Sequence, residues 1–294
     1  MSESAHDKPL APGLYLVATP IGNLEDISLR ALRVLRLVDR IACEDTRQTQ
    51  KLLNHYGIRT ATVSYHQFNE AGRAEELLGA LKAGGRIAIV SDAGTPGIAD
   101  PGAQLAGLAI AAGVPVVPIP GANAAINALI GSGLGAERFT FHGFLPAKPG
   151  ARKTYLEGLA RGAGTHVLYE SPHRLLETLG DVAATFGAGQ HVVVARELTK
   201  LHEEFLRGAV GEIAATLASR PAVKGEIVLL MELAKEAVAG GGASLAEQVA
   251  ALVAAEGLSE KDALKRVAKE RGMGKSEAYR EWQRGRGQGS GLRG

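Results

Sequence analysis

A glycine- and proline-rich loop with the sequence SDAGTPGIADPG runs from Ser91 to Gly102. It joins an apolar run that predicts a buried strand, Arg86 to Val90, to one that predicts a helix, Ala103 to Ala112. Its glycines permit left-handed backbone and close approach of a ligand, while its prolines stiffen the turn. A tight surface turn without a ligand is the alternative, but the loop is longer than the roughly 2 to 6 residues of a usual connection. We therefore expect a ligand-binding loop at the carboxyl end of a strand.

Polar side chains cluster after further predicted strands. The carboxyl ends of parallel strands meet at one edge of a sheet, so these side chains are expected to converge on one cleft. A single cluster taken alone is better explained by a cap or a surface salt bridge, and Glu44 and Asp45 are suited to cap the next helix. The repetition favours a shared site. The clusters are Thr19 to Asn23 with Glu25 and Asp26, Glu44 to Arg47, His66 to Glu70, Ser91 to Thr95, Glu170 to Arg174, and Arg196 to Glu204.

The elements that must position these clusters alternate between strand and helix in the first part of the chain. This rhythm is typical of a parallel sheet with right-handed crossovers. One helix is predicted to reach about Val38, and another runs from Gln48 to Tyr56, where Gly57 ends it. The predicted strands are Leu14 to Ala18, Arg40 to Cys43, Ala61 to Tyr65, Arg86 to Val90, and a buried Val114 to Ile119.

After Gly135 the pattern predicts a second α/β domain whose sheet is mixed. Its last three predicted strands have one helix among them, Glu212 to Ala218, so partly antiparallel pairing is expected. Helices are also predicted at Ala151 to Arg161 and Arg174 to Phe186. The predicted strands are Phe139 to Phe144, Val167 to Tyr169, Val192 to Ala195, Glu204 to Leu206 and Ile227 to Leu233.

A separate helical unit is expected at the C-terminal end. Ser244 with Glu247 and Ser259 with Asp262 have the spacing of helix-capping pairs, and Ser276 can cap a third helix. Between 259 and 294 there are ten Lys and Arg against five Asp and Glu, a local charge of +5 in a chain of net charge +2. This asymmetry favours an anionic partner, above all nucleic acid, over a solvated helical cap. The expected domain limits are 1–12 flexible N-terminus, 13–121 N-terminal α/β domain, 122–235 second α/β domain, 236–243 linker, 244–285 basic helix-turn-helix-like domain and 286–294 disordered tail.

Composition excludes several classes of protein. With 46% apolar and 22% charged residues the chain is globular, and its single cysteine, Cys43, excludes a disulfide framework. The N-terminal residues lack an apolar signal core, so a cytoplasmic location is expected. The stretch from Pro101 to Ala136 has no charge, but its prolines and glycines divide it into pieces too short to cross a bilayer. No metal-binding constellation is present.

Eight sequence blocks occur together in an order and spacing that resemble a known family. They are VATPIGNLEDISLRAL at Val17, CEDTR at Cys43, SDAGTPGIADPG at Ser91, PGANA at Pro120, GFLP at Gly143, YESPHRLLETL at Tyr169, RELTKLHEE at Arg196 and KGEIVLL at Lys224. They resemble the ribosomal RNA small subunit methyltransferase I family, the 16S rRNA cytidine-2′-O-methyltransferases of the tetrapyrrole methylase superfamily, over about Gly13 to Leu233.

The resemblance implies a two-domain tetrapyrrole methylase fold with S-adenosylmethionine bound in the cleft between the domains, and a homodimer acting on 16S rRNA or the 30S subunit. The uncharged stretch from Pro101 to Ala136 is expected to supply an apolar wall. The cofactor-binding positions that it implies are Pro20, Ser91, Asp92, Ala93, Gly94, Ala124, Ala125, Tyr169, Glu226 and Ile227.

The reaction so implied is an in-line displacement in which a ribose 2′-oxygen attacks the sulfonium methyl. Alignment and exclusion of water then contribute much of the rate, and a base assists because the hydroxyl is a weak acid. The candidates for the base, which the sequence does not rank, are Glu44, Asp45, His66, Glu170, Lys200 and Glu203. The candidates for binding the RNA are Asn23, Arg47, Lys148 and Arg174.

Two other functions stay open. A methyltransferase acting on a small tetrapyrrole would share the cofactor loops but would not need a basic C-terminal domain. A non-catalytic RNA-binding module would account for the basic domain but not for the polar strand ends around the loop Ser91 to Gly102.

Overall fold

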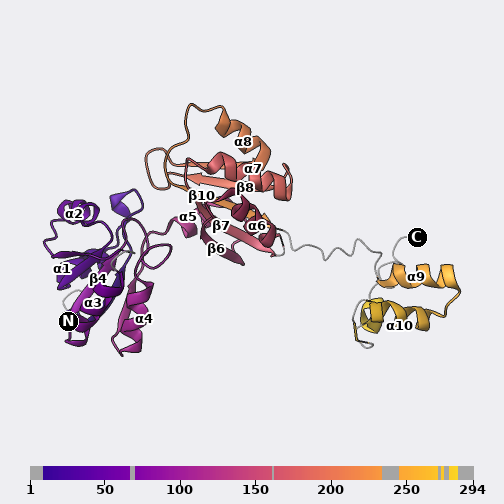
Figure 1. The fold of residues 1–294 in the computed structure, drawn as a ribbon, viewed down its shortest axis with the longest axis horizontal. Helices are drawn as coiled ribbons and strands as arrows, with labels where there is room; N and C mark the ends of the chain where they lie inside the picture. Colours follow the sequence, from indigo (N-terminus) through magenta and orange to yellow (C-terminus); the bar gives the residue numbers. More distant parts are fainter. Residues whose placement is uncertain are drawn as a thin grey trace, which may run out of the picture. The chain divides into compact units, whose positions relative to one another are not determined.

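The computed structural model describes residues 9–66, 70–160, 162–233, 245–270, 273–274 and 278–283. The chain forms two compact units, 1–233 and 234–294 (Figure 1). The predicted linker at 236–243 and the predicted tail at 286–294 lie outside the described residues, as do the first eight residues of the predicted flexible N-terminus. The larger unit contains two five-stranded sheets.

The first sheet is entirely parallel, as the alternating pattern predicted. Its strand order is β3-β2-β4-β1-β5, so the chain crosses over between every successive pair. Two strands, β2 and β4, have the bounds that the sequence predicted. The strands are β1 (Gly13–Val17), β2 (Arg40–Cys43), β3 (Thr62–Ser64), β4 (Arg86–Val90) and β5 (Val116–Ile119).

Helices cover both faces of the first sheet because the side chains of each strand alternate between the faces. Val34 and Leu35 of α1 (Leu29–Leu37) and Leu53 of α2 (Thr46–His55) pack on one face. On the other face, Leu77 of α3 (Glu70–Lys82) and Leu105 of α4 (Ala103–Ala111) pack on β4 and β1. A short 3-10 turn, η1 (Leu24–Asp26), precedes α1.

The uncharged stretch Pro101 to Ala136 is less buried than the sequence predicted. Strand β5 is the edge of the first sheet, with Val116 and Val117 half-buried and Pro118 exposed. Ile110 of α4 is 66% exposed, and Ile130 of α5 (Ala124–Ser132) is 71% exposed. The prediction of a buried strand at Val114 to Ile119 was therefore wrong, because lack of charge does not determine which strand lies at a sheet edge.

The second sheet is mixed, with the order β6-β7-β10-β8-β9. Only β6 and β7 are parallel, and the remaining neighbours pair antiparallel, which confirms the predicted mixed sheet. The register pairs Ile227 with both Glu170 and Arg196, so the carboxyl ends of β7 and β8 lie beside the start of β10. The strands are β6 (Phe139–Phe144), β7 (Gly164–Glu170), β8 (His191–Arg196), β9 (Glu204–Ala209) and β10 (Ile227–Leu233).

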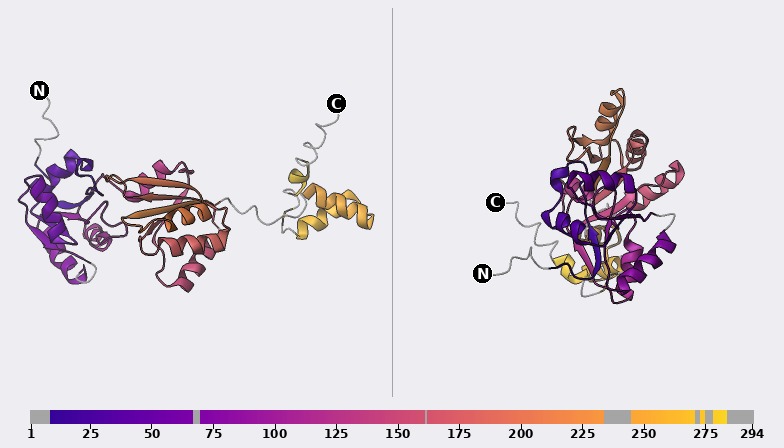
Figure 2. Two further views of the ribbon diagram at one scale, coloured as in Figure 1. Left: turned by 90° about the horizontal axis from the view of Figure 1, so that it is seen from above. Right: turned by 90° about the vertical axis from the view of Figure 1, so that its left-hand side faces the viewer.

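Four helices enclose the second sheet. Helix α5, which Asn123 caps through a 3.1 Å hydrogen bond from Ile126 N, packs Ala128 and Leu129 on one face. The other face is covered by α6 (Pro149–Leu159), α7 (Leu175–Phe186) and α8 (Val210–Ala218) (Figure 2).

The smaller unit contains the helices α9 (Leu245–Glu256) and α10 (Glu260–Glu270). Ser259 caps α10 through a 3.2 Å hydrogen bond from Asp262 N, which confirms that predicted capping pair. The predicted caps Ser244 and Ser276 lie outside the described residues. Within the described parts of the chain, no helix has both the length and the apolar character needed to span a membrane.

Candidate active site

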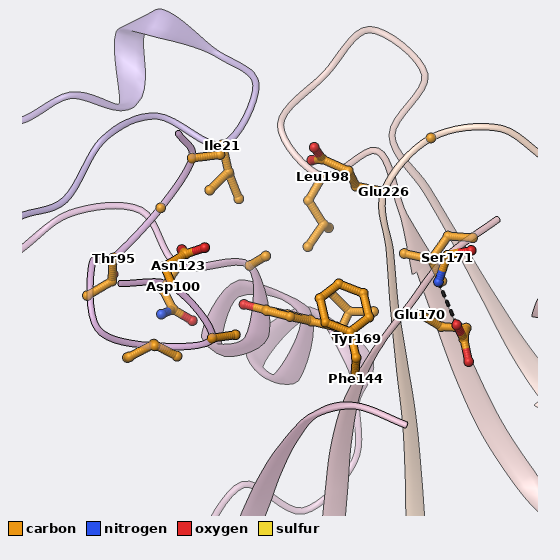
Figure 3. Close-up of a pocket in the computed structure, with 18 of the residues that line it drawn as sticks. Ile21, Thr95, Asp100, Asn123, Phe144, Tyr169, Glu170, Ser171, Leu198 and Glu226 are labelled. Carbon is orange, nitrogen blue, oxygen red and sulfur yellow. Dashed lines mark hydrogen bonds between the residues drawn. The ribbon is translucent and has the colours of Figure 1, made fainter. Parts of the chain in front are cut away.

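A cavity of about 360 Å³ lies where loops of the first sheet face the edge of the second. This volume falls in the range of small-molecule sites, roughly 300 to 1,000 Å³. Gly94 and Asp100 come from the loop after β4, and Ala124 comes from the start of α5. Tyr169 at the end of β7 and Glu226 just before β10 come from the second sheet (Figure 3). Ile227 at the start of β10 also lines the cavity.

The loop after β4 takes the conformation that its glycines predicted. Gly94, Gly97 and Gly102 have φ values of +87°, +83° and +133°, in the region that favours glycine. Gly94 pairs with Thr19 through two backbone hydrogen bonds of 2.9 and 3.1 Å, which ties this loop to the loop after β1. A Cβ added at Gly94 would lie 3.3 Å from Ile21 Cγ2, so a side chain here would crowd the cavity wall.

Carboxylates gather at the edge of the first sheet. Burial raises the pKa of Asp100 to about 6, and the negative charges of Glu44 and Asp92 add to this effect. Burial and the charge of Asp92 also raise the pKa of Glu44. The residue before Asp100, Ala99, has a φ of +60°, a conformation that costs a non-glycine residue about 1 kcal/mol or more. Asp100 is thus a desolvated carboxylate in the cavity wall with a pKa close to neutrality.

Glu170, at the edge of the second sheet, has a carboxylate that is both hydrogen-bonded and ion-paired. It accepts hydrogen bonds from Ser171 N at 2.7 Å and Thr178 Oγ1 at 2.6 Å, and it forms a 3.0 Å ion pair with Arg174. Its side chain has 0% exposure. Although Glu170 belongs to the cavity wall, these partners make it a structural anchor between β7 and α7.

Lys200 is held in ion pairs beside the cavity. Its Nζ donates to Glu197 at 2.8 Å and to Glu226 at 3.2 Å. Burial acts to lower the pKa of Lys200, but the hydrogen bond to Glu197 and the charge of Glu226 outweigh it and raise the pKa. A protonated lysine of this kind is a poor base, and it links the start of β10 to the loop after β8.

Seven of the predicted site residues line the cavity, from both sheets: Ala93, Gly94, Ala124, Tyr169, Glu170, Glu226 and Ile227. Other predicted positions lie outside the lining: Pro20, Asn23, Glu44, Asp45, His66, Arg47, Ser91, Asp92, Ala125, Lys148, Arg174, Lys200 and Glu203.

Several of the positions outside the lining have defined structural partners. Asp45 caps α2 and pairs with Arg47 at 2.7 Å, and the hydrogen bonds from Arg47 lower the pKa of Asp45 to about 2. Glu203 accepts a 2.6 Å hydrogen bond from Thr199 N. The buried hydroxyl of Ser91 donates to Gly94 O at 3.2 Å, so it shapes the loop.

The lining also contains residues that were not among the predicted site residues, including Asp100, Asn123, Phe144 and Leu198. All four lie in sequence blocks noted above: Asp100 in the loop Ser91 to Gly102, Asn123 in PGANA, Phe144 in GFLP and Leu198 in RELTKLHEE. The direction of the Phe144 side chain depends on an irregularity of strand β6 that no sequence pattern marked. Within the described residues, no three His, Cys, Asp or Glu side chains are grouped as a metal site requires.

The sequence as a whole matches one protein family and named relatives. A model of the family described as Tetrapyrrole (Corrin/Porphyrin) Methylases matches residues 13–214. The chain is 52% identical over 219 residues to ribosomal RNA small subunit methyltransferase I of Halalkalibacterium halodurans, covering 74% of this chain and 75% of that protein. It is 49% identical over 220 residues to the protein of the same name in Escherichia coli O157:H7, covering 74% and 77%.

Solved structures share the fold. The larger unit is similar to diphthine synthase, with a TM-score of 0.58 and 15% identity over 75% of this chain and 89% of that one. It is also similar to uroporphyrin-III-C-methyltransferase from Thermus thermophilus, with a TM-score of 0.52 and 19% identity over 76% and 94% of the chains. At such low identity these similarities establish the fold alone.

Proposed function

This chain belongs to the tetrapyrrole methylase family, and on that premise we propose that it methylates the ribose 2′-oxygen of a cytidine in 16S rRNA of the small ribosomal subunit, with S-adenosylmethionine as the methyl donor. The observation that carries the proposal is the cavity, in which a glycine-rich loop of the first sheet carries a desolvated carboxylate and faces the aromatic edge of the second sheet. The relatives named as ribosomal RNA methyltransferases favour RNA as the methyl acceptor.

The cavity fits a methyl donor that has no phosphate groups. Gly94 and Ala93 line one side, and Ile227 lines the other. Small and apolar residues of this kind suit adenosine and a zwitterionic amino-acid tail. A Cβ at Gly94 would lie 3.3 Å from Ile21 Cγ2, so a side chain would crowd the wall at that point.

When bound, S-adenosylmethionine supplies an electrophilic methyl group on a sulfonium. The chain's own contribution is alignment, exclusion of water and acceptance of one proton. We assign the proton acceptor to Asp100, whose carboxylate lies in the cavity wall with a pKa of about 6. With the methyl donor bound, this carboxylate would accept the proton that the ribose hydroxyl loses when it is methylated.

The six predicted bases take supporting roles in this assignment. Glu44 is charge-coupled to Asp100 and helps to keep its pKa high. His66 is in turn charge-coupled to Glu44 and lowers its pKa slightly against the larger effect of burial. Asp45, Glu170, Lys200 and Glu203 serve structural contacts.

The basic face of α10 supports RNA as the partner. Lys261, Lys265 and Lys269 are exposed, whereas Leu264 and Val267 between them are buried. The cationic side chains therefore lie on the solvent side of the helix, where they can neutralise phosphates. We assign phosphate contacts to this face and, in the larger unit, to Arg47, whose side chain is 87% exposed.

A homodimer in the cytoplasm completes the proposal. Ile126 and Ile130, spaced one turn apart on α5, are 43% and 71% exposed, and Ile110 of α4 is 66% exposed. Apolar side chains of this size commonly pack against a partner. Sedimentation analysis tests this part, with a single monomeric species as the contradicting result.

A label-transfer assay tests the proposed function. Purified protein is incubated with methyl-labelled S-adenosylmethionine and, in separate reactions, with 16S rRNA, 30S subunits or a porphyrinoid. Nuclease digestion followed by nucleoside chromatography should place the label in 2′-O-methylcytidine. Label in the porphyrinoid supports a tetrapyrrole methyltransferase instead, and RNA binding without transfer supports a non-catalytic module.

A further inference from the structure

Phe144 is the most exposed of the large apolar residues of the cavity wall. Its exposed fraction is 57%, against 39% for Ile98 and between 3% and 7% for Ile21, Leu198 and Ile227. Those three residues form a covered part of the wall, and Phe144 forms part of the rim. An aromatic ring held in solvent at the rim of a cavity forgoes the favourable free energy that burial of its apolar surface would provide.

An irregularity in strand β6 aims this ring at the cavity. In a regular strand, residues 141 and 144 would point to opposite faces because side chains alternate. The register of β6 against β7 shifts between Phe141 and Phe144, and Gly143 has a φ of +65°. Both phenylalanines consequently contact the same ring, that of Tyr169. Bulges at sheet edges commonly redirect a side chain next to a functional site, and β6 is an edge strand.

Tyr169 anchors the exposed ring without covering it. The Phe141 and Tyr169 centroids are 4.9 Å apart at 71°, and those of Phe144 and Tyr169 are 5.6 Å apart at 63°. Both are edge-to-face contacts, a geometry that restricts the orientation of the Phe144 ring. Tyr169 and Phe144 lie together at one side of the cavity, across from Asp100 and Asn123 (Figure 3).

We propose that Phe144 is the stacking platform for the nucleobase of the nucleotide to be methylated; this inference rests on the proposed function. Proteins that recognise unpaired RNA stack splayed bases on aromatic side chains. A base on Phe144 sits at the cavity rim, so its own ribose is the sugar that enters the cavity. The platform therefore selects which 2′-hydroxyl reaches Asp100.

The charges of the cavity favour a base over a phosphate beside this ring. Asp100 and Glu226 are both acidic lining residues; Glu226 is ion-paired with Lys200 at 3.2 Å, and its side chain is 72% exposed. Carboxylates repel phosphate groups but accept hydrogen bonds from base amino groups such as N4 of cytosine. The covered residues Ile21, Leu198 and Ile227 suit the cofactor, which leaves the rim to the ligand that arrives from solvent.

The test compares Phe144→Ala with a matched control, Phe139→Ala. Phe139 is on the same edge strand and is 42% exposed, but it lies at the other end of β6 and outside the cavity lining. A second variant, Phe144→Trp, keeps an aromatic face. The full chain is used throughout, with 16S rRNA and 30S subunits as probes. The dissociation constant for RNA and the KM for RNA are measured, together with the calorimetric affinity for S-adenosylmethionine.

We expect Phe144→Ala to raise the KM for RNA about 10- to 100-fold, as is typical for loss of one stacked base. Its affinity for S-adenosylmethionine should stay within about 3-fold of the wild type, which also shows that the variant is folded. Phe144→Trp should retain most of the RNA affinity, and Phe139→Ala should match the wild type. The platform is refuted if Phe144→Ala binds and methylates RNA normally, or if it loses cofactor affinity alone. A wild-type protein that transfers no label to any RNA refutes the proposed function itself.

Discussion

The carboxylates at the two sheet edges that bound the cavity have pKa values shifted in opposite directions. At the edge of the first sheet, Glu44, Asp92 and Asp100 act on one another as like charges, and burial raises the pKa of Glu44 and Asp100. At the edge of the second sheet, hydrogen bonds from Arg220 and Arg196 lower the pKa of Glu204 to about 2, and Lys200 lowers that of Glu197.

This difference separates chemistry from structure within one cavity. A carboxylate crowded by like charges gains from accepting a proton, whereas one paired with a guanidinium or ammonium resists it. We therefore locate proton transfer at the first edge and ascribe to the second edge the rigid positioning of Tyr169, Phe144 and the start of β10. Substitutions at one edge should therefore change either catalysis and cofactor binding or stability, and leave the contribution of the other edge intact.

Replacing the proton acceptor should have the largest effect. Asp100→Asn removes the base and should lower kcat about 100-fold or more, while the affinity for S-adenosylmethionine changes little. The wild-type rate should rise as the pH passes about 6, because the carboxylate must be ionised to accept a proton. Asp100→Asn should lose this pH dependence. Glu44→Gln serves as a control that should move the inflection to lower pH, since Glu44 raises the pKa of Asp100. A normal kcat in Asp100→Asn would refute the assignment.

The second-largest effect is expected from Gly94→Ala, which should weaken binding of the cofactor. In Gly94→Ala the new Cβ lies 3.3 Å from Ile21 Cγ2, so calorimetry should show an affinity for S-adenosylmethionine about 10- to 100-fold lower. Gly97→Ala is the matched control, because Gly97 has a similar φ of +83° but its Cβ would make only an ordinary contact with Ala103. Equal losses in both variants would mean that backbone strain alone is responsible.

Glu170 should affect stability more than catalysis. Glu170→Ala leaves Arg174 without its ion pair and the buried hydroxyl of Thr178 without its acceptor. We expect a loss of about 2 kcal/mol in the free energy of unfolding, measured by urea denaturation. The kcat of the folded protein should stay within a few-fold of the wild type. A stable variant with no activity would instead move Glu170 to the catalytic group.

The smallest expected effect is a stabilisation. The pKa of Asp100 is raised from 3.8 to about 6 on folding, so the folded state binds this proton more tightly than the unfolded state. Stability from this group is present at low pH and is lost as the pH rises through about 6. Asp100→Asn should therefore raise the melting temperature at pH 7.5, and the gain should shrink toward pH 4. A gain that is independent of pH would show that the carboxylate is not destabilised by its surroundings.

Much of the fold was predictable, because it depends on local patterns. Strands β2, β4, β6 and β10 have the predicted bounds, and the parallel and mixed pairings are as expected. The exposure of β5 was not predictable, since sheet order is set by the packing of the whole domain. The loop Ser91 to Gly102 was identified from its glycines, whose positive φ angles the structure confirms.

The roles of charged residues were harder to predict because they depend on partners distant in sequence. Lys200 is a candidate base until its contact with Glu226 is known. The raised pKa of Asp100 depends in part on the charge of Glu44, which follows another strand and is distant in the sequence. Phe144 falls in a predicted strand, yet its direction follows from the bulge at Gly143.

A crystal structure of the protein with S-adenosylmethionine tests the central claim most directly. The account predicts one ordered cofactor that contacts Gly94 from the first edge and Ile227 from the second, with Phe144 still open to solvent. Cofactor bound outside this cavity, or in contact with one edge only, would contradict it.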